Sequence, residues 1–348
     1  MKDRNRYVTG VLAALGMLVV ILDGKTAQHS VVEGLALCIK TVIPALFPFL
    51  ILSGMLNSTL LGNRSKILDG IENFCGLPQG SGSVLLIGFL SGYPVGAQLV
   101  GQAYTDGCLT RSSARRMLGF CSNAGPAFIF GMLSPLFQNP ITPWLLWGIH
   151  IGGAVFASKI LTTQGDLSCR IDKTPTRSLS MSLQNAMRLM VTVCGWVILF
   201  RLLLGFFDKW FLWLLPKNIQ IITAGLVELS NGCVQLSKLP QEGLRFLFAS
   251  VLLGAGGLCV AMQTCSVTQG LGMGVYFPGK VLQTLFSAVV SYILQPLLFS
   301  QEQRVILPVS VFVLFPLIAV FVFTFFFFRK KVVAFSGRML YNTDNHMR

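Results

Sequence analysis

The sequence predicts an all-α, polytopic membrane protein built from two structural repeats, with re-entrant helical hairpins or broken helices. Three observations lead to this fold class. Hydrophobic residues make up 53% of the 348-residue chain and charged residues only 11%, whereas soluble domains carry about 25% charged residues. The apolar residues form long runs and do not alternate with polar ones, which favours helices over strands. Some of these runs are interrupted by glycine and proline, which a simple spanning helix does not need.

The net charge of +14 is not a nucleic-acid signature, because Lys and Arg lie in short clusters between apolar runs. Such clusters mark the cytoplasmic ends of membrane helices, and the resulting positive field would favour an anionic solute. The nine cysteines have no paired or metal-like spacing and read as small apolar residues. We therefore expect no disulfide, no metal and no cofactor; a coupling ion stays open.

Apolar runs place the expected spans in order along the chain. They cover residues 8–22, about 32–61, 117–137, 141–163, 186–207, 246–266, 276–299 and 305–328. Two short, broken stretches, 83–104 and 219–236, lie between them, and 62–80 is amphipathic and expected at the membrane interface. The charge clusters require an even number of crossings and inverted repeats an odd number, so the exact topology stays open.

The domain organisation follows from these spans. We expect an N-terminal span and loop at 1–30, a first repeat at 31–163, a cytoplasmic linker at 164–185, a second repeat at 186–300, and a final span with a basic tail at 301–348.

Two apolar stretches suggest an internal duplication. The sequence SVLLIGFLSGYPVGAQ (83–98) aligns with SVLLGAGGLCVAMQ (250–263): each begins Ser-Val-Leu-Leu, becomes rich in glycine and ends in Gln. Two weaker pairs of segments, one upstream and one downstream of these stretches, keep the same order in both halves, which favours repeats, most simply inverted ones. Transporters built from such repeats bind substrate near the midplane, where discontinuous helices meet.

The break in SGYPVG (91–96) is the first candidate site. Gly92 and Gly96 allow unusual backbone angles and close approach, and Pro94 interrupts the helix. Freed amides at such a tip can bind an anion. A helix-packing face of glycines with a proline kink is the alternative. The candidate ligand-binding residues of the first half are Ser91, Gly92, Tyr93, Pro94, Gly96, Gln98, Asn123, Gly125 and Pro126.

Asn123 precedes Gly125 and Pro126, an arrangement that unwinds a helix and directs a polar side chain into the protein; the alternative is an ordinary helix cap.

Glu228 is an intramembrane carboxylate for binding a hydroxyl, an amine or a coupling proton. Its alternative is an interfacial ion pair with Lys238 or Lys217. The candidates of the second half are Glu228, Ser230, Asn231, Gly256, Gly257 and Gln263.

Four other basic residues lie in or beside apolar runs: Lys40, Arg188, Arg201 and Lys280. We expect them to snorkel to the interface, although one of them could neutralise an anionic substrate. His150 lies in an apolar span and is expected to be a packed neutral side chain, with a role in a proton relay as the alternative. No nucleophile elbow, phosphate loop, dinucleotide fingerprint or metal cluster is present, so the protein is not expected to be an enzyme.

The chain resembles the sporulation integral membrane protein YlbJ/SpoVV family, which carries the nucleoside-recognition Gate domain. The resemblance covers roughly 35–300 and rests on SGYPVG, on SNAGP at 122–126 and on Pro44 and Pro48 upstream. In the second half it rests on Gly225, Glu228 and Gly232 and on the stretch that ends at Gln263. The chain departs from the family at TRSSARRM (110–117), which lacks the acidic residue usual after the first hairpin.

The resemblance implies a fold like that of concentrative nucleoside transporters, and transport of dipicolinic acid across the outer forespore membrane during sporulation. The expected partners are a small-molecule substrate and the lipid bilayer, not nucleic acid, and a homo-oligomer stays open. Two alternatives remain: a nucleoside transporter coupled to H⁺ or Na⁺, and a non-transporting membrane assembly protein needed for spore maturation.

Overall fold

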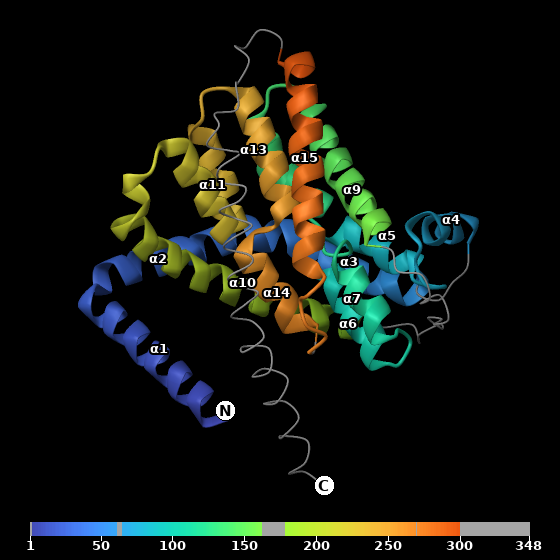
Figure 1. Cartoon of the computed structure of the whole chain (residues 1–348), viewed down its shortest axis with the longest axis horizontal. Helices are drawn as coiled ribbons and strands as arrows, with labels where there is room; N and C mark the ends of the chain where they lie inside the picture. Colours follow the sequence, from blue (N-terminus) through green and yellow to red (C-terminus); the bar gives the residue numbers. More distant parts are fainter. Residues whose placement is uncertain (1, 61–64, 162–177, 269, 300–348) are drawn as a thin grey trace.

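A computed structural model describes residues 2–60, 65–161, 178–268 and 270–299 (Figure 1). Helices are the only regular elements in these four ranges, which confirms the all-α class. The expected span at 305–328, the whole segment 301–348 and most of the expected linker 164–185 lie outside the described residues.

The helices follow one another with short connections, and π or 3₁₀ turns interrupt several of them. Their bounds are α1 Lys2–Leu22, α2 Gly24–Leu37, α3 Ile43–Leu60, α4 Lys66–Cys75, α5 Gly82–Ser91, α6 Val95–Thr105, α7 Arg111–Leu118, α8 Pro126–Phe128, α9 Thr142–Ile160, α10 Leu179–Trp210, α11 Lys217–Val227, α12 Leu229–Gln235, α13 Glu242–Ala255, α14 Gly257–Val267 and α15 Tyr276–Leu298.

Within the described part, four helical stretches are long and apolar enough to cross a membrane: Gly24–Leu56, Leu179–Trp210, Glu242–Val267 and Tyr276–Leu298. They coincide with four of the expected spans, so the sequence-based assignment to the membrane class is confirmed. The expected span at 117–137 is wrong as a continuous helix. The chain there leaves α7 at Leu118, runs without regular structure past Asn123, and resumes as short helical turns from Pro126.

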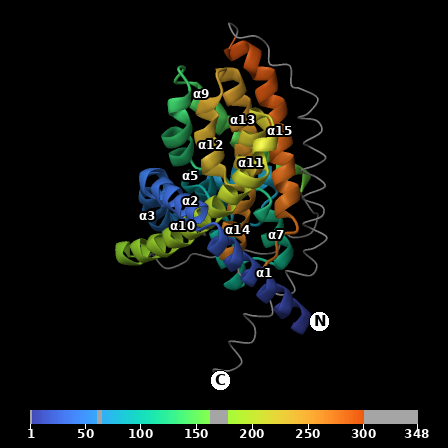
Figure 2. The ribbon, with the colours of Figure 1, turned by 90° about the vertical axis from the view of Figure 1, so that its left-hand side faces the viewer.

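The long helices form two groups that cross. The helices α9, α13 and α15 stand side by side, and α2, α10 and α3 run across them (Figures 1 and 2). A buried apolar cluster joins α3, α5, α6, α7 and α10, and a second joins α9, α11, α12 and α13. The short helices α5, α6, α7 and α14 are thereby enclosed by protein, as short helices within a membrane must be.

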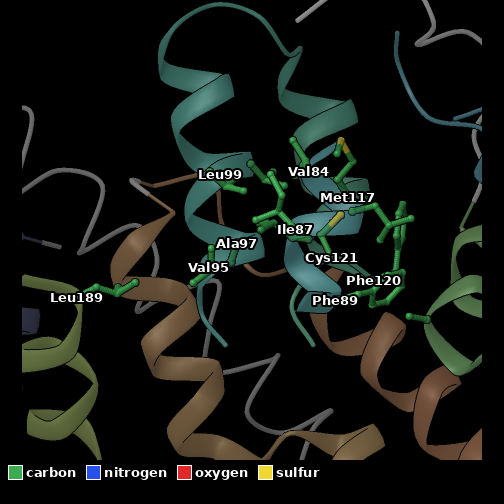
Figure 3. Packing of buried hydrophobic residues seen from close by; sticks show 14 of the residues in the cluster. Val84, Ile87, Phe89, Val95, Ala97, Leu99, Met117, Phe120, Cys121 and Leu189 are labelled. Carbon is green, nitrogen blue, oxygen red and sulfur yellow. The ribbon is translucent and has the colours of Figure 1, made fainter. Parts of the chain in front are cut away.

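Two pairs of short helices form hairpins. The helices α5 and α6 pack along each other (Figure 3), since a Cβ atom at Gly88 would lie 3.3 Å from the Cα of Gly96. The helices α11 and α12 do the same, and a Cβ atom at Gly232 would overlap the Cα of Gly225. A helix of ten residues spans only about 15 Å, half of a bilayer's apolar thickness of about 30 Å. Both broken stretches expected at 83–104 and 219–236 are therefore present as hairpins.

The stretch 250–263, which aligns with 83–98, has a different geometry. The helices α13 and α14 are joined at Gly256 and Gly257 and follow one another without packing side by side (Figure 1). This is a discontinuous helix, whereas 83–98 is a hairpin. The internal duplication stays a prediction, and the structure offers α11–α12 as a closer geometric counterpart of α5–α6.

Candidate functional site

The tip of the α5–α6 hairpin is buried and irregular, as the SGYPVG sequence predicts. Gly92 ends α5 with φ of +83°, a backbone angle that other residues adopt at a cost. Pro94 precedes α6, and no side chain caps that helix. Ser91 is 1% exposed and Tyr93 6% exposed, so the tip lies inside the protein.

The unwound segment 119–125 lies directly against this tip. A Cβ atom at Gly125 would lie 2.7 Å from the backbone nitrogen of Gly92, and one at Gly96 would overlap the carbonyl oxygen of Cys121. Only glycine at these positions allows such close backbone contact. The glycines therefore do serve close backbone packing, as the alternative interpretation expected. This packing brings the first two candidate motifs, SGYPVG and the segment around Asn123, into contact.

Asn123 is fully buried in the unwound segment. Its Nδ2 donates to the carbonyl of Phe120 at 2.6 Å, and its Oδ1 accepts no hydrogen bond from the described residues. The residue does not cap a helix, since Gly125 precedes α8 and Pro126 occupies the first turn. The unwinding predicted for this motif is confirmed.

Glu228 forms the tip of the α11–α12 hairpin and is 1% exposed. Its Oε1 accepts from the Ser230 backbone nitrogen at 3.1 Å and its Oε2 from that of Asn231 at 2.6 Å. The carboxylate thus caps α12. Among the described ion pairs none joins it to a lysine, so the expected alternative of a pair with Lys238 or Lys217 does not occur. A role toward substrate or proton stays a prediction.

All four helix breaks lie in one continuous row. The Tyr93 hydroxyl donates to the carbonyl of Leu253 at 3.1 Å, and a Cβ atom at Gly256 would lie 3.3 Å from that hydroxyl. A Cβ atom at Gly257 would lie 2.9 Å from the carbonyl oxygen of Gly225, one turn before the Glu228 tip. The order is segment 119–125, the α5–α6 tip, the α13–α14 break and the α11–α12 tip.

The two glutamines that end the aligned stretches occupy different surroundings. Gln98 is partly exposed on α6, whereas Gln263 is 4% exposed on α14 and its Nε2 contacts the Cys259 sulfur at 3.3 Å. The helices α6 and α14 pack against each other, but no described hydrogen bond joins the two side chains.

The expectation that Lys280 reaches the membrane interface is wrong, while the alternative that one of the four basic residues meets an anionic substrate stays a prediction. Lys280 is 4% exposed, and its Nζ donates to the carbonyl of Ser122 at 2.6 Å and to Oε1 of Gln283 at 3.1 Å. It lies near the start of α15, where a lysine normally reaches the interface. Here the start of α15 is covered, because Gly279 lets the backbone of Gly119 lie against it. The rule that a charge within a span marks function would have found it.

His150 is also buried, as predicted, at 1% exposure on α9. Its Nε2 accepts from the backbone nitrogen of Ala124 at 2.9 Å, while its Nδ1 has no partner among the described residues. Lys280 and His150 therefore both bind the backbone of the unwound segment, at Ser122 and at Ala124. The polar side chains of Ser91, Asn123, Glu228, Lys280 and His150 are each at most 4% exposed.

The comparisons with known proteins identify one relative by sequence. The chain is 26% identical over 313 residues to the sporulation integral membrane protein YlbJ of Bacillus subtilis (strain 168), and the match covers 74% of each chain. No protein-family model and no solved structure matches. The chain is thus a homologue of a sporulation integral membrane protein, which supports the resemblance; the Gate domain stays a prediction.

Proposed function

We propose that this protein is a multi-pass transporter of a small polar or anionic solute, and that dipicolinate crossing the outer forespore membrane during sporulation is its solute. The proposal rests on one observation: four helix breaks from distant parts of the chain meet in one buried row. Such breaks leave backbone groups without helical partners, which is tolerated inside a membrane where the broken backbone lines a binding site.

Unpartnered side-chain atoms at the first two breaks support a ligand site. Ser91 Oγ, Asn123 Oδ1 and His150 Nδ1 are buried and make no hydrogen bond with the described residues. Each buried polar atom left without a partner costs about 1–3 kcal/mol. A solute with its own donors and acceptors would recover that free energy on binding.

Dipicolinate fits this environment in chemistry and in biological context. It is a planar dianion whose carboxylates accept hydrogen bonds from backbone amides and hydroxyls, and the chain carries a net charge of +14. The relative is a sporulation protein by name. Glu228 is not part of the α5–α6 tip: its carboxylate lies at the α11–α12 tip, where two backbone amides of α12 donate to it.

The test measures dipicolinate in the spore-forming host. Deletion of the gene is expected to leave spores poor in dipicolinate while the mother cell still produces it, and wild-type protein in liposomes is expected to take up labelled dipicolinate. Normal spore dipicolinate in the deletion strain, together with no uptake by the liposomes, would refute the proposal.

The two alternatives give different results in the same liposomes. If the protein is a nucleoside transporter coupled to H⁺ or Na⁺, its transport activity would be inhibited by uridine and not by dipicolinate (pyridine-2,6-dicarboxylate). An assembly protein would move neither, and it would tolerate Ser91→Ala and Asn123→Ala while failing when Gly92 or Gly96 is replaced by a bulky residue.

A further inference from the structure

We propose that Lys280 binds a carboxylate group of the transported solute, in a site completed by His150 and the unwound segment 119–125. The inference deepens the proposed function and rests on it. It concerns two side chains, one from α15 and one from α9, that contact the same irregular backbone at Ser122 and Ala124.

The charge of Lys280 is the first step. Lys280 is 4% exposed, and its ammonium donates to a backbone carbonyl and to a side-chain amide oxygen, which carry only partial charges. Buried charges are normally paired with an opposite charge. The ion pairs among the described residues lie within α2, within α10 or between α10 and the start of the chain from Asp23 to Glu33, and none includes Lys280.

Arg201 is another of the four basic residues in or beside apolar runs, and its charge is already neutralised inside the helix bundle. Arg201 pairs with Glu33 and lies 3.7 Å from Asp208. Lys40 and Arg188 are exposed on the outer side of their helices. Lys280 is therefore the one member of this set that is buried among the described residues without an acidic partner.

The aromatic rings around Lys280 connect it to the helix breaks. Its Nζ lies 5.1 Å from the ring centre of Tyr93 and 5.8 Å from that of Tyr276. Cation–π contacts of this kind stabilise an ammonium that has left water. Tyr93 is also the residue that joins the α5–α6 tip to α13. A ligand at Lys280 would thus act on the contact that joins the α5–α6 tip to α13.

The hydrogen bonding of His150 supplies a second donor. Because Nε2 accepts from the backbone nitrogen of Ala124, the hydrogen of the imidazole is on Nδ1. That Nδ1 is buried and without a partner among the described residues. An ammonium and a free N–H donor held by Ser122 and Ala124, two residues apart, form a pair suited to a carboxylate and not to a cation.

The experiment compares two ligands of the same shape and different charge. Purified full-length protein in detergent is titrated with pyridine-2,6-dicarboxylate, a dianion, and with the neutral pyridine-2,6-dicarboxamide. Wild type is expected to prefer the dianion. Lys280→Gln should weaken dianion binding about ten- to hundredfold and change diamide binding less than about threefold. Lys280→Arg should retain the preference, and Lys40→Gln serves as the control lysine.

The possible results separate the two proposals. Equal weakening of both ligands by Lys280→Gln would make Lys280 a purely structural residue, and an unchanged dianion affinity would also overturn the inference, while transport of dipicolinate by wild type would leave the proposed function standing. If the glutamine variant does not fold, wild type alone decides: equal affinity for the diamide and the dianion would exclude a carboxylate-binding cation. Binding of neither ligand, with no uptake by liposomes, would refute both proposals.

Discussion

The two hairpin tips of this protein are built alike in their glycine contacts and differ in their capping. Gly96 lies against the Cys121 carbonyl below the first tip, and Gly232 lies against Gly225 below the second. At the first tip, α6 begins after Pro94 without a side-chain cap. At the second, the Glu228 carboxylate accepts hydrogen bonds from the first amides of α12.

This difference separates a closed turn from a tip that can accept a ligand. A capped helix start has already satisfied part of its amide groups with its own carboxylate. In a helix start without a side-chain cap, the amide groups stay available to a ligand, and so does the partial positive charge. The first tip also lies beside Lys280 and the unpartnered Ser91 hydroxyl. We therefore expect the ligand at the first tip, with Glu228 chiefly supporting the second.

The largest loss of stability should come from replacing the closely packed glycine that each hairpin contains, Gly96 in the first and Gly232 in the second. In Gly96→Ala and Gly232→Ala the added methyl group would overlap backbone atoms, which cannot move aside as a side chain can. Overpacking of this kind lowers the free energy of unfolding by about 1–3 kcal/mol or more. Thermal unfolding in detergent should show both variants destabilised to a similar degree.

Gly148→Ala is the matched control for these glycines. A Cβ atom at Gly148 meets nothing within 4 Å on the exposed side of α9, and replacing an exposed helical glycine by alanine stabilises by about 0.5–1 kcal/mol. If Gly96→Ala were as stable as Gly148→Ala, the close packing of the first hairpin would be wrong.

The capping difference predicts that Glu228→Ala destabilises the protein by about 1–2 kcal/mol, because two buried amides of α12 lose their acceptor. Glu228→Gln keeps one carbonyl acceptor and should lose less. The measurement is the melting temperature of each variant, with dipicolinate uptake as the second readout. A stable alanine variant that has lost all uptake would contradict this assignment and make Glu228 a transport residue.

The sequence predicts the breaks well and their surroundings poorly. The glycines, Pro94 and Glu228 predict broken helices. Glycine fits backbone angles that other residues adopt at a cost, and a carboxylate is rarely tolerated within a membrane. The burial of Lys280 depends on contact between Gly279 and Gly119, which are 160 positions apart and carry no joint pattern. The alignment of 83–98 with 250–263 rests on similar residues in the same order. It does not distinguish a hairpin from a discontinuous helix, because that difference is set by contacts with the rest of the protein.

Tyr93→Phe tests the link between the two halves. The hydroxyl donates to the Leu253 carbonyl, and loss of one such hydrogen bond costs about 0.5–1.5 kcal/mol. Since this bond closes the α5–α6 tip onto α13, the variant should lose a little stability, while its ring still lies beside Lys280 and binding of a dianion persists. Loss of dianion binding with unchanged melting temperature would show instead that the hydroxyl contacts the ligand.

Ser91→Ala should have the smallest effect on stability and the most informative effect on function. The Ser91 hydroxyl is buried without a partner, so its removal is expected to leave the free energy of unfolding unchanged or slightly higher. If the hydroxyl serves the ligand, uptake of dipicolinate should fall several-fold in a fully folded protein. Ser230→Ala is the matched change at the capped tip, where the hydroxyl interaction with Glu228 is lost and the hydrogen bond from the Ser230 backbone nitrogen should survive. Reduced uptake in the first variant alone would place the ligand at the α5–α6 tip, whereas equal uptake in both would remove the functional distinction between the two tips.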